Sequence, residues 1–321
     1  MKILVTRSME PKLFVEFGDV EIDMWPELDE MPPDEFADAV SSADGVITFL
    51  TDVVDHALLN RASDLRVISQ VAVGVDNIDL ARCTLRGIPV GHTPDVLTET
   101  TADTAWALLG AAVRRVGEGI DHVRRGEWGP WRPDVLLGGD LHGTTLGIIG
   151  LGRIGIAIAR RASGFGMRVI YTAQRRKPHA EAEMRVSYRA LEGLLEEADH
   201  IIVAAPLTDE TRHLIDARAL DRMKPTATLV NIARGPIVDT EALVEALRTG
   251  SIRSAALDVT DPEPLPADHP LVGLSNCLVI PHLGSASHRT REAMAELAVA
   301  NLAAGLRGDR MQHCANPSVY Q

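Results

Sequence analysis

Short apolar runs recur along the whole chain, and most of them lack the alternation of apolar and polar residues expected of a half-exposed strand. Continuous apolar runs of this length are typical of strands buried on both faces, as in parallel sheets. The intervening segments are long enough for crossover helices, so the pattern predicts two parallel α/β sheets. The predicted strands are residues 3–5, 46–49, 67–71, 146–150, 169–171, 201–204, 229–232, 255–257 and 278–280.

A different pattern occupies residues 99–125, where apolar residues follow helical spacing throughout. It predicts one long helix, with Gly117 and Gly119 as the expected place of any break. A segment rich in glycine, proline and tryptophan, 126–139, then leads to the next strand. We therefore expect the chain to pass into a second domain at about residue 98, and the final helix, 289–306, to return it to the first.

The composition is that of a folded globular protein. The chain has 321 residues, enough for about two domains, and its 45% hydrophobic and 24% charged residues exclude disorder, a coiled coil and a collagen-like fibre. The 45 acidic residues outnumber the 32 basic ones, which gives a net charge of −13. This balance argues against a general nucleic-acid or anionic-membrane binder, although a cluster of bases can still bind a small anion.

The three cysteines form no C-x-x-C pair, and the histidines show no metal-binding spacing, so neither a disulfide framework nor a metal site is predicted. The apolar run at residues 3–5 is too short for a signal peptide, and no stretch approaches the roughly 20 apolar residues that span a bilayer. We therefore expect a cytoplasmic protein.

The sequence G-L-G-R-I-G at residues 150–155 is a G-x-G-x-x-G motif between a predicted strand and a run of good helix formers. Gly150 permits a tight turn, Gly152 lets the backbone reach a pyrophosphate, and Gly155 lets helix and strand approach closely. The helix N-terminus offers amides and partial positive charge to that anion. A glycine-rich turn without a ligand is the alternative, but the flanking strand and helix favour dinucleotide binding. The loop residues expected at the cofactor are Gly150, Gly152, Arg153, Ile154 and Gly155.

The next predicted strand ends in a basic turn. An NAD-specific site expects Asp or Glu about 20 residues beyond the glycines, to bind the ribose hydroxyls. No acidic residue stands there; instead Gln174 is followed by Arg175, Arg176 and Lys177. Guanidinium groups suit the 2′-phosphate of NADP, so we predict a preference for NADP(H), with NAD(H) also possible. A solvated basic turn is the alternative.

Arg234, Glu263 and His282 each follow a different predicted strand of the second half. Ligands of open α/β sheets bind outside the carboxyl ends of the strands, so the three side chains are expected to meet beside the cofactor. Each residue taken alone has an ordinary alternative. Arg234 could form a surface ion pair, Glu263 could be merely solvated, and His282 could cap a strand end. Together they are the groups that reduction of a 2-keto acid needs.

In that reaction Arg234 would bind the substrate carboxylate and stabilise charge on the carbonyl oxygen, and His282 would donate the proton. A neighbouring Glu263 would favour the charged imidazole and orient it. In the first half of the chain, Gly74 follows a buried-strand pattern where backbone amides can approach a small anion. A plain strand-to-turn glycine fits Gly74 equally well.

These residues lie in longer stretches that resemble the D-isomer-specific 2-hydroxyacid dehydrogenase family, whose ordered Arg, Glu and His match Arg234, Glu263 and His282. The resemblance covers nearly the whole chain and is weakest over about the first 64 residues. Within the family the chain is most similar to members that reduce glyoxylate and hydroxypyruvate, giving glycolate and D-glycerate. The matching stretches are R-G-I-P-V-G-H-T-P-D-V-L-T-E-T-T-A (86–102), L-G-I-I-G-L-G-R-I-G (146–155), L-D-V-T-D-P-E-P-L-P (257–266) and I-P-H-L-G-S-A-S-H-R-T-R (280–291).

The resemblance implies a Rossmann NAD(P)-binding domain, residues 98–286, inserted in a flavodoxin-like substrate domain formed by 1–97 and 287–321. It also implies a homodimer in which an arm at about 99–140 packs on the partner, and the D stereochemistry of the product. The further contacts that it implies are Val73, Gly74, Ser285 and Trp131 for the substrate and Pro206, Ile232, Asp258 and Gly284 for the cofactor.

Two other interpretations remain open from the sequence. One is a dehydrogenase of another small 2-keto or 2-hydroxy acid, or of phosphoglycerate. The other is a non-catalytic corepressor, which would sense a dinucleotide and bind partner peptides on the same fold. The acidic balance of the chain disfavours the corepressor.

Overall fold

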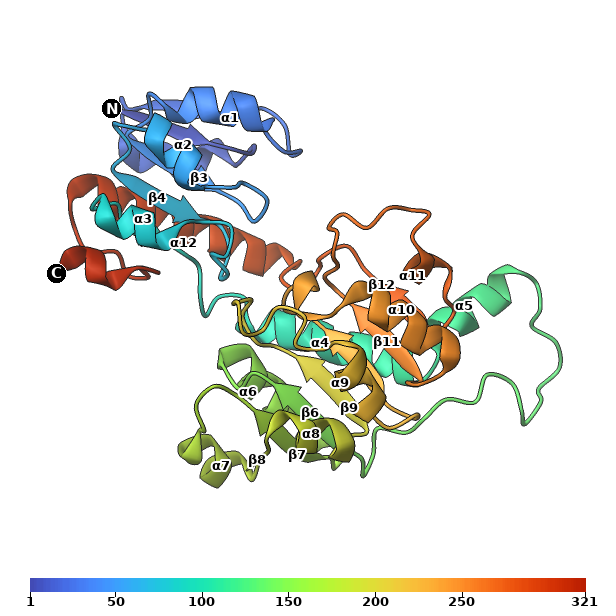
Figure 1. Cartoon of the computed structure of the whole chain (residues 1–321). Coiled ribbons are helices and arrows are strands. Elements are labelled where there is room, and N and C mark those ends of the chain that lie inside the picture. Colours follow the sequence, from blue (N-terminus) through green and yellow to red (C-terminus); the bar gives the residue numbers. More distant parts are fainter. The chain divides into compact units, whose positions relative to one another are not determined.

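The computed structural model describes all 321 residues. It divides into two compact units, residues 1–97 with 287–321 and residues 98–286, and each unit is built around one parallel sheet (Figure 1). Strands whose residues are all buried, such as β3, β4 and β9–β11, account for the continuous apolar runs of the sequence. The two doubly wound parallel sheets predicted from those runs are therefore confirmed.

The first unit has five strands in the order β2-β1-β3-β4-β5, which is the flavodoxin-like order 2-1-3-4-5. Helices α1, α2 and α3 share one apolar core with the sheet, and α12 packs against β3 and β4. The strands are β1 (Lys2–Val5), β2 (Glu21–Met24), β3 (Gly45–Thr48), β4 (Val67–Gln70) and β5 (Val90–Gly91). The helices are η1 (Pro11–Phe17), α1 (Pro33–Val40), α2 (His56–Arg61), α3 (Leu80–Leu85), α12 (His288–Arg307) and η4 (Pro317–Tyr320).

The second unit has seven strands in the order β12-β11-β10-β9-β6-β7-β8, the Rossmann order extended by one strand. Helices α4 and α6 pack on one face, and α8, α9 and α10 on the other. The strands are β6 (Thr145–Ile149), β7 (Arg168–Thr172), β8 (Ser187–Tyr188), β9 (His200–Val203), β10 (Thr228–Asn231), β11 (Ser254–Leu257) and β12 (Cys277–Val279). The helices are α4 (Thr98–Val113), α5 (Val116–Arg124), α6 (Arg153–Ala162), η2 (Ser163–Phe165), α7 (Pro178–Met184), α8 (Leu191–Glu197), α9 (Ala217–Arg222), η3 (Gly235–Ile237), α10 (Thr240–Thr249) and α11 (Pro270–Gly273).

Side-chain caps define where several helices begin. The residue before the helix is Asp or Ser, and its side-chain oxygen accepts the amide hydrogen of the third helical residue, which has no carbonyl partner within the helix. The pairs are Asp55 with Leu58, Asp79 with Arg82, Asp216 with Ala219, Asp239 with Ala242 and Ser287 with Thr290.

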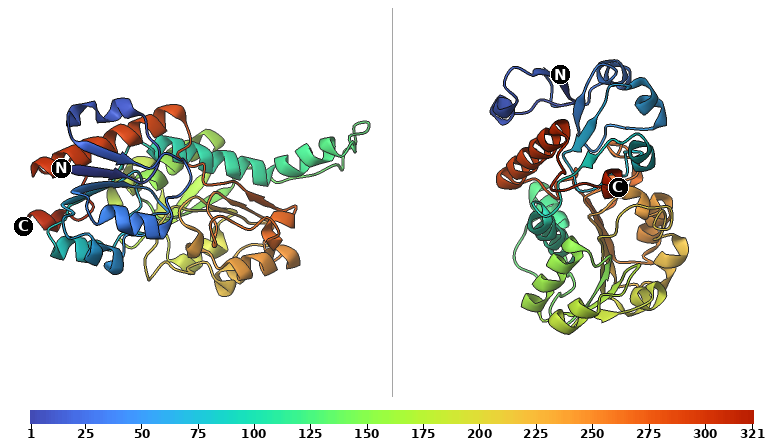
Figure 2. Two further views of the ribbon diagram at one scale, coloured as in Figure 1. Left: turned by 90° about the horizontal axis from the view of Figure 1, so that it is seen from above. Right: turned by 90° about the vertical axis from the view of Figure 1, so that its left-hand side faces the viewer.

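The predicted long helix is broken near Gly117, as expected, but the break itself lies at Arg114 and Arg115. It ends at Val113, and α5 starts at Val116 after Arg115, whose φ of 54° lies in the left-handed region. Gly117 stays inside α5, where a Cβ atom would lie 2.5 Å from Leu278 Cδ2. This glycine therefore allows close packing of α5 on β12. Beyond the break, α5 and the loop after it project from the rest of their unit (Figure 2).

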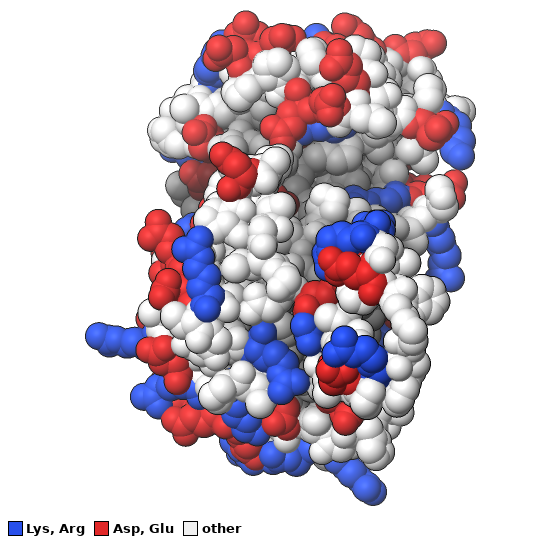
Figure 3. All heavy atoms as spheres, turned by 90° about the vertical axis from the view of Figure 1, so that its right-hand side faces the viewer, with Lys and Arg blue, Asp and Glu red and all other residues white.

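None of the helices combines the length and the apolar character required to cross a membrane. On the face drawn in Figure 3, acidic and basic side chains are interspersed among uncharged ones, without a continuous basic surface.

Candidate active site

The glycine loop follows β6 and leads directly into α6. Gly150 has a φ of 99°, and a Cβ atom there would lie 2.6 Å from the backbone nitrogen of Ala205. A Cβ atom at Gly155 would lie 2.1 Å from the carbonyl oxygen of Gly150, so packing requires glycine at both positions. At Gly152, the N-cap of α6, no atom lies within 4 Å of the Cβ position. The loop therefore leaves the first turn of α6 open to a pyrophosphate, and it fits a dinucleotide.

A tight turn after β12 carries the histidine. His282 has a φ of 52°, in a region that few non-glycine residues occupy. Asp258, which follows β11, holds this turn: its carboxylate accepts hydrogen bonds from the amides of Leu283 (2.5 Å) and Gly284 (2.9 Å). Its own carbonyl oxygen accepts the amide of His282 at 2.9 Å. Burial raises the pKa of Asp258, against the lowering effect of these amides and of His282.

His282 and Glu263 form a short hydrogen-bonded pair, with 2.6 Å between His282 Nδ1 and Glu263 Oε1. The second carboxylate oxygen accepts the amide hydrogen of Thr260 at 3.2 Å. Burial acts to raise the pKa of Glu263, but the hydrogen bond and charge of His282, the Thr260 amide and the charge of Arg234 together lower it. An ionised Glu263 accepts a hydrogen bond from Nδ1–H, which leaves Nε2 as the nitrogen available to a substrate.

The loop after β10 brings Arg234 to the same edge of the sheet. Its backbone is fixed by Asn231, whose side-chain amide donates to the carbonyl oxygen of Arg234 at 2.8 Å. A Cβ atom at the next residue, Gly235, would lie 1.9 Å from the carbonyl oxygen of Thr260. Only glycine lets the Arg234 loop approach the Glu263 loop this closely. Arg234, Glu263 and His282 thus come from three neighbouring strands and stand at the carboxyl edge of one sheet.

The other residues expected in this unit have different surroundings. Ile232 and Ser285 are buried, and Pro206 is exposed, with its carbonyl oxygen accepting the Thr211 hydroxyl at 2.7 Å. Trp131 lies in the loop after α5 and is 85% exposed. Asp258 is 2% exposed, and both of its carboxylate oxygens serve the His282 turn.

The basic turn 174–177 joins β7 to α7 next to the glycine loop, because the amide of Gly150 donates to the carbonyl oxygen of Thr172 at 2.9 Å. Gln174, Arg175 and Arg176 are all exposed. The guanidinium of Arg176 forms an ion pair with the carboxylate of Glu181 in α7. The sequence pattern did not indicate this contact.

In the first unit, the loop after β4 that contains Val73 and Gly74 is held by a buried side chain. Gln70, the last residue of β4, donates to the carbonyl oxygen of Gly74 at 2.8 Å and to Asn77 Oδ1 at 2.6 Å. Asn77 in turn donates to the carbonyl oxygen of Asp52 at 2.7 Å. The sequence pattern alone does not distinguish Gln70 or Asn77 as functional residues. The available signal was a polar residue near the end of a strand predicted to be buried.

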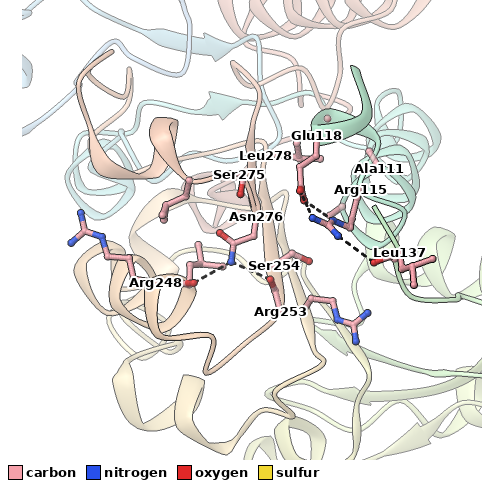
Figure 4. Close-up of a pocket in the computed structure, with 15 residues that line it drawn as sticks. Ala111, Arg115, Glu118, Leu137, Arg248, Arg253, Ser254, Ser275, Asn276 and Leu278 are labelled. Atoms are coloured by element: carbon pink, nitrogen blue, oxygen red, sulfur yellow. Dashed lines mark hydrogen bonds and ion pairs between the residues drawn. The ribbon is translucent and has the colours of Figure 1, made fainter. Parts of the chain in front are cut away.

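A pocket of about 690 Å³ lies elsewhere in the second unit (Figure 4). Its lining includes Ser254, the first residue of β11, and Asn276, just before β12. It therefore lies at the amino ends of these strands, opposite the edge with His282. Arg115 of the α4–α5 junction also lines the pocket and pairs with Glu118.

Comparison with known proteins agrees with this geometry. Residues 106–284 match the model of the D-isomer specific 2-hydroxyacid dehydrogenase NAD binding domain. The chain is 46% identical over 313 residues to the glyoxylate reductase of Thermococcus gammatolerans, covering 96% of this chain and 93% of that one.

Two solved structures are also similar to the chain. One is a protein of Thermus thermophilus, with TM-score 0.91 and 47% identity over 98% of this chain and 100% of that one. The other is the NADPH-dependent glyoxylate/hydroxypyruvate reductase of Sinorhizobium meliloti in complex with NADP and malonate. It has TM-score 0.85 and 32% identity over 99% of this chain and 97% of that one.

The fold, the glycine loop and these matches define an NAD(P)-dependent oxidoreductase that takes a nicotinamide dinucleotide as cofactor. The chain belongs to the D-isomer specific 2-hydroxyacid dehydrogenase family.

Proposed function

We propose that the protein reduces glyoxylate and hydroxypyruvate with NADPH, giving glycolate and D-glycerate. The observation that carries the proposal is the 2.6 Å bond between His282 Nδ1 and Glu263, because it directs Nε2 to a substrate. The names of the similar proteins, glyoxylate reductase and glyoxylate/hydroxypyruvate reductase, support the choice of substrates. Dehydrogenation of another small 2-keto or 2-hydroxy acid is the second candidate, favoured by the same geometry.

The chain's own residues divide the chemistry as follows. When bound, the dinucleotide supplies the hydride for the carbonyl carbon. The Arg234 guanidinium binds the substrate carboxylate and stabilises negative charge on the carbonyl oxygen. His282 donates its Nε2 proton to that oxygen, and Glu263 stabilises the charged ring and fixes its tautomer. We further propose that the amides of Val73 and Gly74 take part in binding the carboxylate, with Ser285 beside the substrate.

The preference for NADP(H) over NAD(H) is part of the proposal. It rests on the turn after β7, where Arg175 and Arg176 occupy the region in which an NAD site has an acidic residue. The Sinorhizobium meliloti relative is described as NADPH-dependent and was solved with NADP, which supports it. Pro206, Ile232 and Gly284 are proposed to lie along the cofactor, and Asp258 to act there through the His282 turn.

We also propose a homodimer formed through the arm. The arm carries several apolar side chains that are exposed in the single chain, and exposed apolar side chains gathered on one segment are typical of an interaction surface. They are Val116, Ile120, Val123, Trp128, Trp131, Val135 and Leu137. A cytoplasmic location remains an expectation from the sequence.

The test is an absorbance assay at 340 nm with NADPH or NADH against a panel of 2-keto acids. We expect oxidation of NADPH with glyoxylate and hydroxypyruvate. The His282→Gln variant should lose about 10²- to 10⁴-fold in kcat, the range typical of a general acid. NADPH titration of the same variant should give an unchanged Kd.

Rapid oxidation of NADPH or NADH with another keto acid, and none with glyoxylate or hydroxypyruvate, would favour a dehydrogenase of another small 2-keto or 2-hydroxy acid. NADPH binding without turnover on any keto acid would contradict the enzyme and point to the corepressor. Wild-type kcat in His282→Gln would exclude this histidine as the proton donor.

A further inference from the structure

A hydrogen-bond network of four residues closes the basic turn against α7. The Tyr171 hydroxyl donates to Glu181 Oε1 at 2.7 Å and accepts the amide hydrogen of Lys177 at 2.7 Å. Arg176 then binds both oxygens of Glu181, through Nε at 2.8 Å and Nη2 at 2.7 Å. Tyr171 is fully buried, and the Glu181 side chain is only 15% exposed. The Glu181 carboxylate of α7 is therefore a fixed partner of this turn.

The network separates the two arginines of the turn. Arg176 uses its bidentate fork on Glu181, whereas the guanidinium of Arg175 has no hydrogen bond or ion pair within the chain. The hydrogen bonds from Arg176 and Tyr171 lower the pKa of Glu181 to about 2, so the carboxylate is charged at any pH at which the enzyme works. A phosphate bound at the turn could therefore pair with the guanidinium of Arg175, whereas that of Arg176 is already paired with Glu181.

We propose that Glu181 is a specificity-determining residue that limits discrimination in favour of the adenosine 2′-phosphate by holding Arg176 in an internal ion pair. This inference rests on the proposed preference for NADP(H). Arg175 then supplies the charge-assisted hydrogen bonds to the phosphate, and Arg176 contributes only when Glu181 is neutral. Because the Arg176 side chain is 64% exposed, the ion pair is of the weak, solvent-accessible kind, and its effect on affinity is modest.

The test measures binding by calorimetry on the full chain, with adenosine 2′,5′-bisphosphate and 5′-AMP as probes that differ only in the 2′-phosphate. Glu181→Gln keeps an oxygen that can accept the Tyr171 hydroxyl but removes the charge. We expect it to bind the bisphosphate about two- to fivefold more tightly than wild type, with 5′-AMP unchanged. Arg175→Gln should bind the bisphosphate about tenfold more weakly.

Glu183 provides a matched control on the same helix. It is exposed and pairs with His179 at 3.4 Å instead of with the turn. Glu183→Gln makes the same change in net charge, and we expect it to leave both affinities unchanged. The double variant Glu181→Gln/Arg176→Gln should bind the bisphosphate no more tightly than wild type, because the tighter binding of Glu181→Gln requires Arg176.

Several outcomes would overturn the inference: no gain in Glu181→Gln, an equal gain in Glu183→Gln, or a gain that survives removal of Arg176. Equal affinity of the wild type for the two probes would contradict the proposed preference for NADP(H). Glu181 is still judged separately, by the change in bisphosphate affinity between wild type and Glu181→Gln. Circular dichroism of each variant checks that the fold is kept. Arg176→Gln alone leaves the Glu181 carboxylate without its ion pair, so we expect it to bind the bisphosphate more weakly than wild type, and Glu181→Gln in that background to restore wild-type affinity.

Discussion

Glu263 links the chemistry of the site to the stability of the fold. Burial acts to raise the pKa of this carboxyl, but His282, the Thr260 amide and the charge of Arg234 together lower it below its ordinary value of 4.5. A carboxyl whose pKa is lower in the folded chain than in the unfolded one stabilises the fold when it is ionised. That contribution is complete above the ordinary pKa and is lost as the pH falls through the lowered value.

We therefore expect wild type and Glu263→Gln to differ most in free energy of unfolding near neutral pH. The difference should shrink below pH 4.5, because the wild-type carboxyl takes up its proton there while glutamine does not titrate. Urea unfolding at a series of pH values measures it. A difference that is constant from about pH 7 to pH 3 would show that Glu263 contributes nothing through its charge.

At this scale the sequence predicted the chemical groups but not all of their partners. Arg234, Glu263 and His282 were found because each follows a strand, and strand ends of parallel sheets share one edge. The pairing of Arg176 with Glu181 was not found, since it depends on where α7 packs and on the direction of two long side chains. Gln70 was missed because a buried polar residue reveals its role only through its hydrogen bonds.

The loops after β10 and β11 illustrate how a single position controls an element. Gly235→Ala would place a methyl group 1.9 Å from the Thr260 carbonyl oxygen, so one of the two loops must move. We expect a loss of about 1–3 kcal/mol in stability, as for other overpacked sites, together with reduced kcat, because Arg234 and Glu263 lie on these loops.

Gly193 in α8 is the matched control, since no atom lies within 4 Å of its Cβ position. Gly193→Ala should keep wild-type kcat and gain about 0.5–1 kcal/mol, the usual preference of a helix for alanine over glycine. Thermal unfolding and kcat of both variants check the pair. Unchanged kcat in Gly235→Ala would refute the positioning role of this contact.

The loop after β4 depends on Gln70 in the same way. Gln70→Ala removes the hydrogen bonds to Gly74 and Asn77, so the amides proposed to bind the substrate carboxylate lose their support. We expect the KM for the keto acid to rise about tenfold, with the Kd of NADPH unchanged.

Ser69, the preceding residue of β4, bonds instead to the carbonyl oxygen of Ala298 in α12 at 2.7 Å. Ser69→Ala should lower the stability and leave KM unaltered. Steady-state kinetics of Gln70→Ala and Ser69→Ala distinguish a positioning role of Gln70 from general destabilisation. Equal changes in KM in the two variants would indicate general destabilisation.

The elements themselves followed the sequence closely where they are long and buried. All nine predicted strands are present, within one or two residues at their ends. The strands not predicted are β2, which is an edge strand without a fully buried residue, and β5 and β8, which have two residues each. Such segments bury too little apolar surface to leave a pattern, and they are ordered by the strand beside them.

For the whole molecule, the proposed dimer makes a direct prediction. Ile120 and Val123 are exposed and lie three residues apart on α5, so they share one face of that helix. Two glutamates at these positions would place charges in the proposed interface. We expect Ile120→Glu/Val123→Glu to be monomeric in light scattering at concentrations at which wild type is dimeric.

Leu85 of α3 is similarly exposed but lies outside the arm. Leu85→Glu should therefore leave the mass in solution unchanged. A dimeric double variant, or a monomeric wild type, would be evidence against assembly through the arm.

The packing of α12 bears on how the chain folds as it is made. Gly305 of this helix lies so close to β4 that a Cβ atom would stand 2.4 Å from Val67 Cγ2, so α12 is part of the first unit's core. That unit is assembled from both ends of the chain, whereas residues 98–286 form an uninterrupted unit. During synthesis the inserted unit can close as soon as it has left the ribosome. The first unit cannot complete its core until α12 has been synthesised.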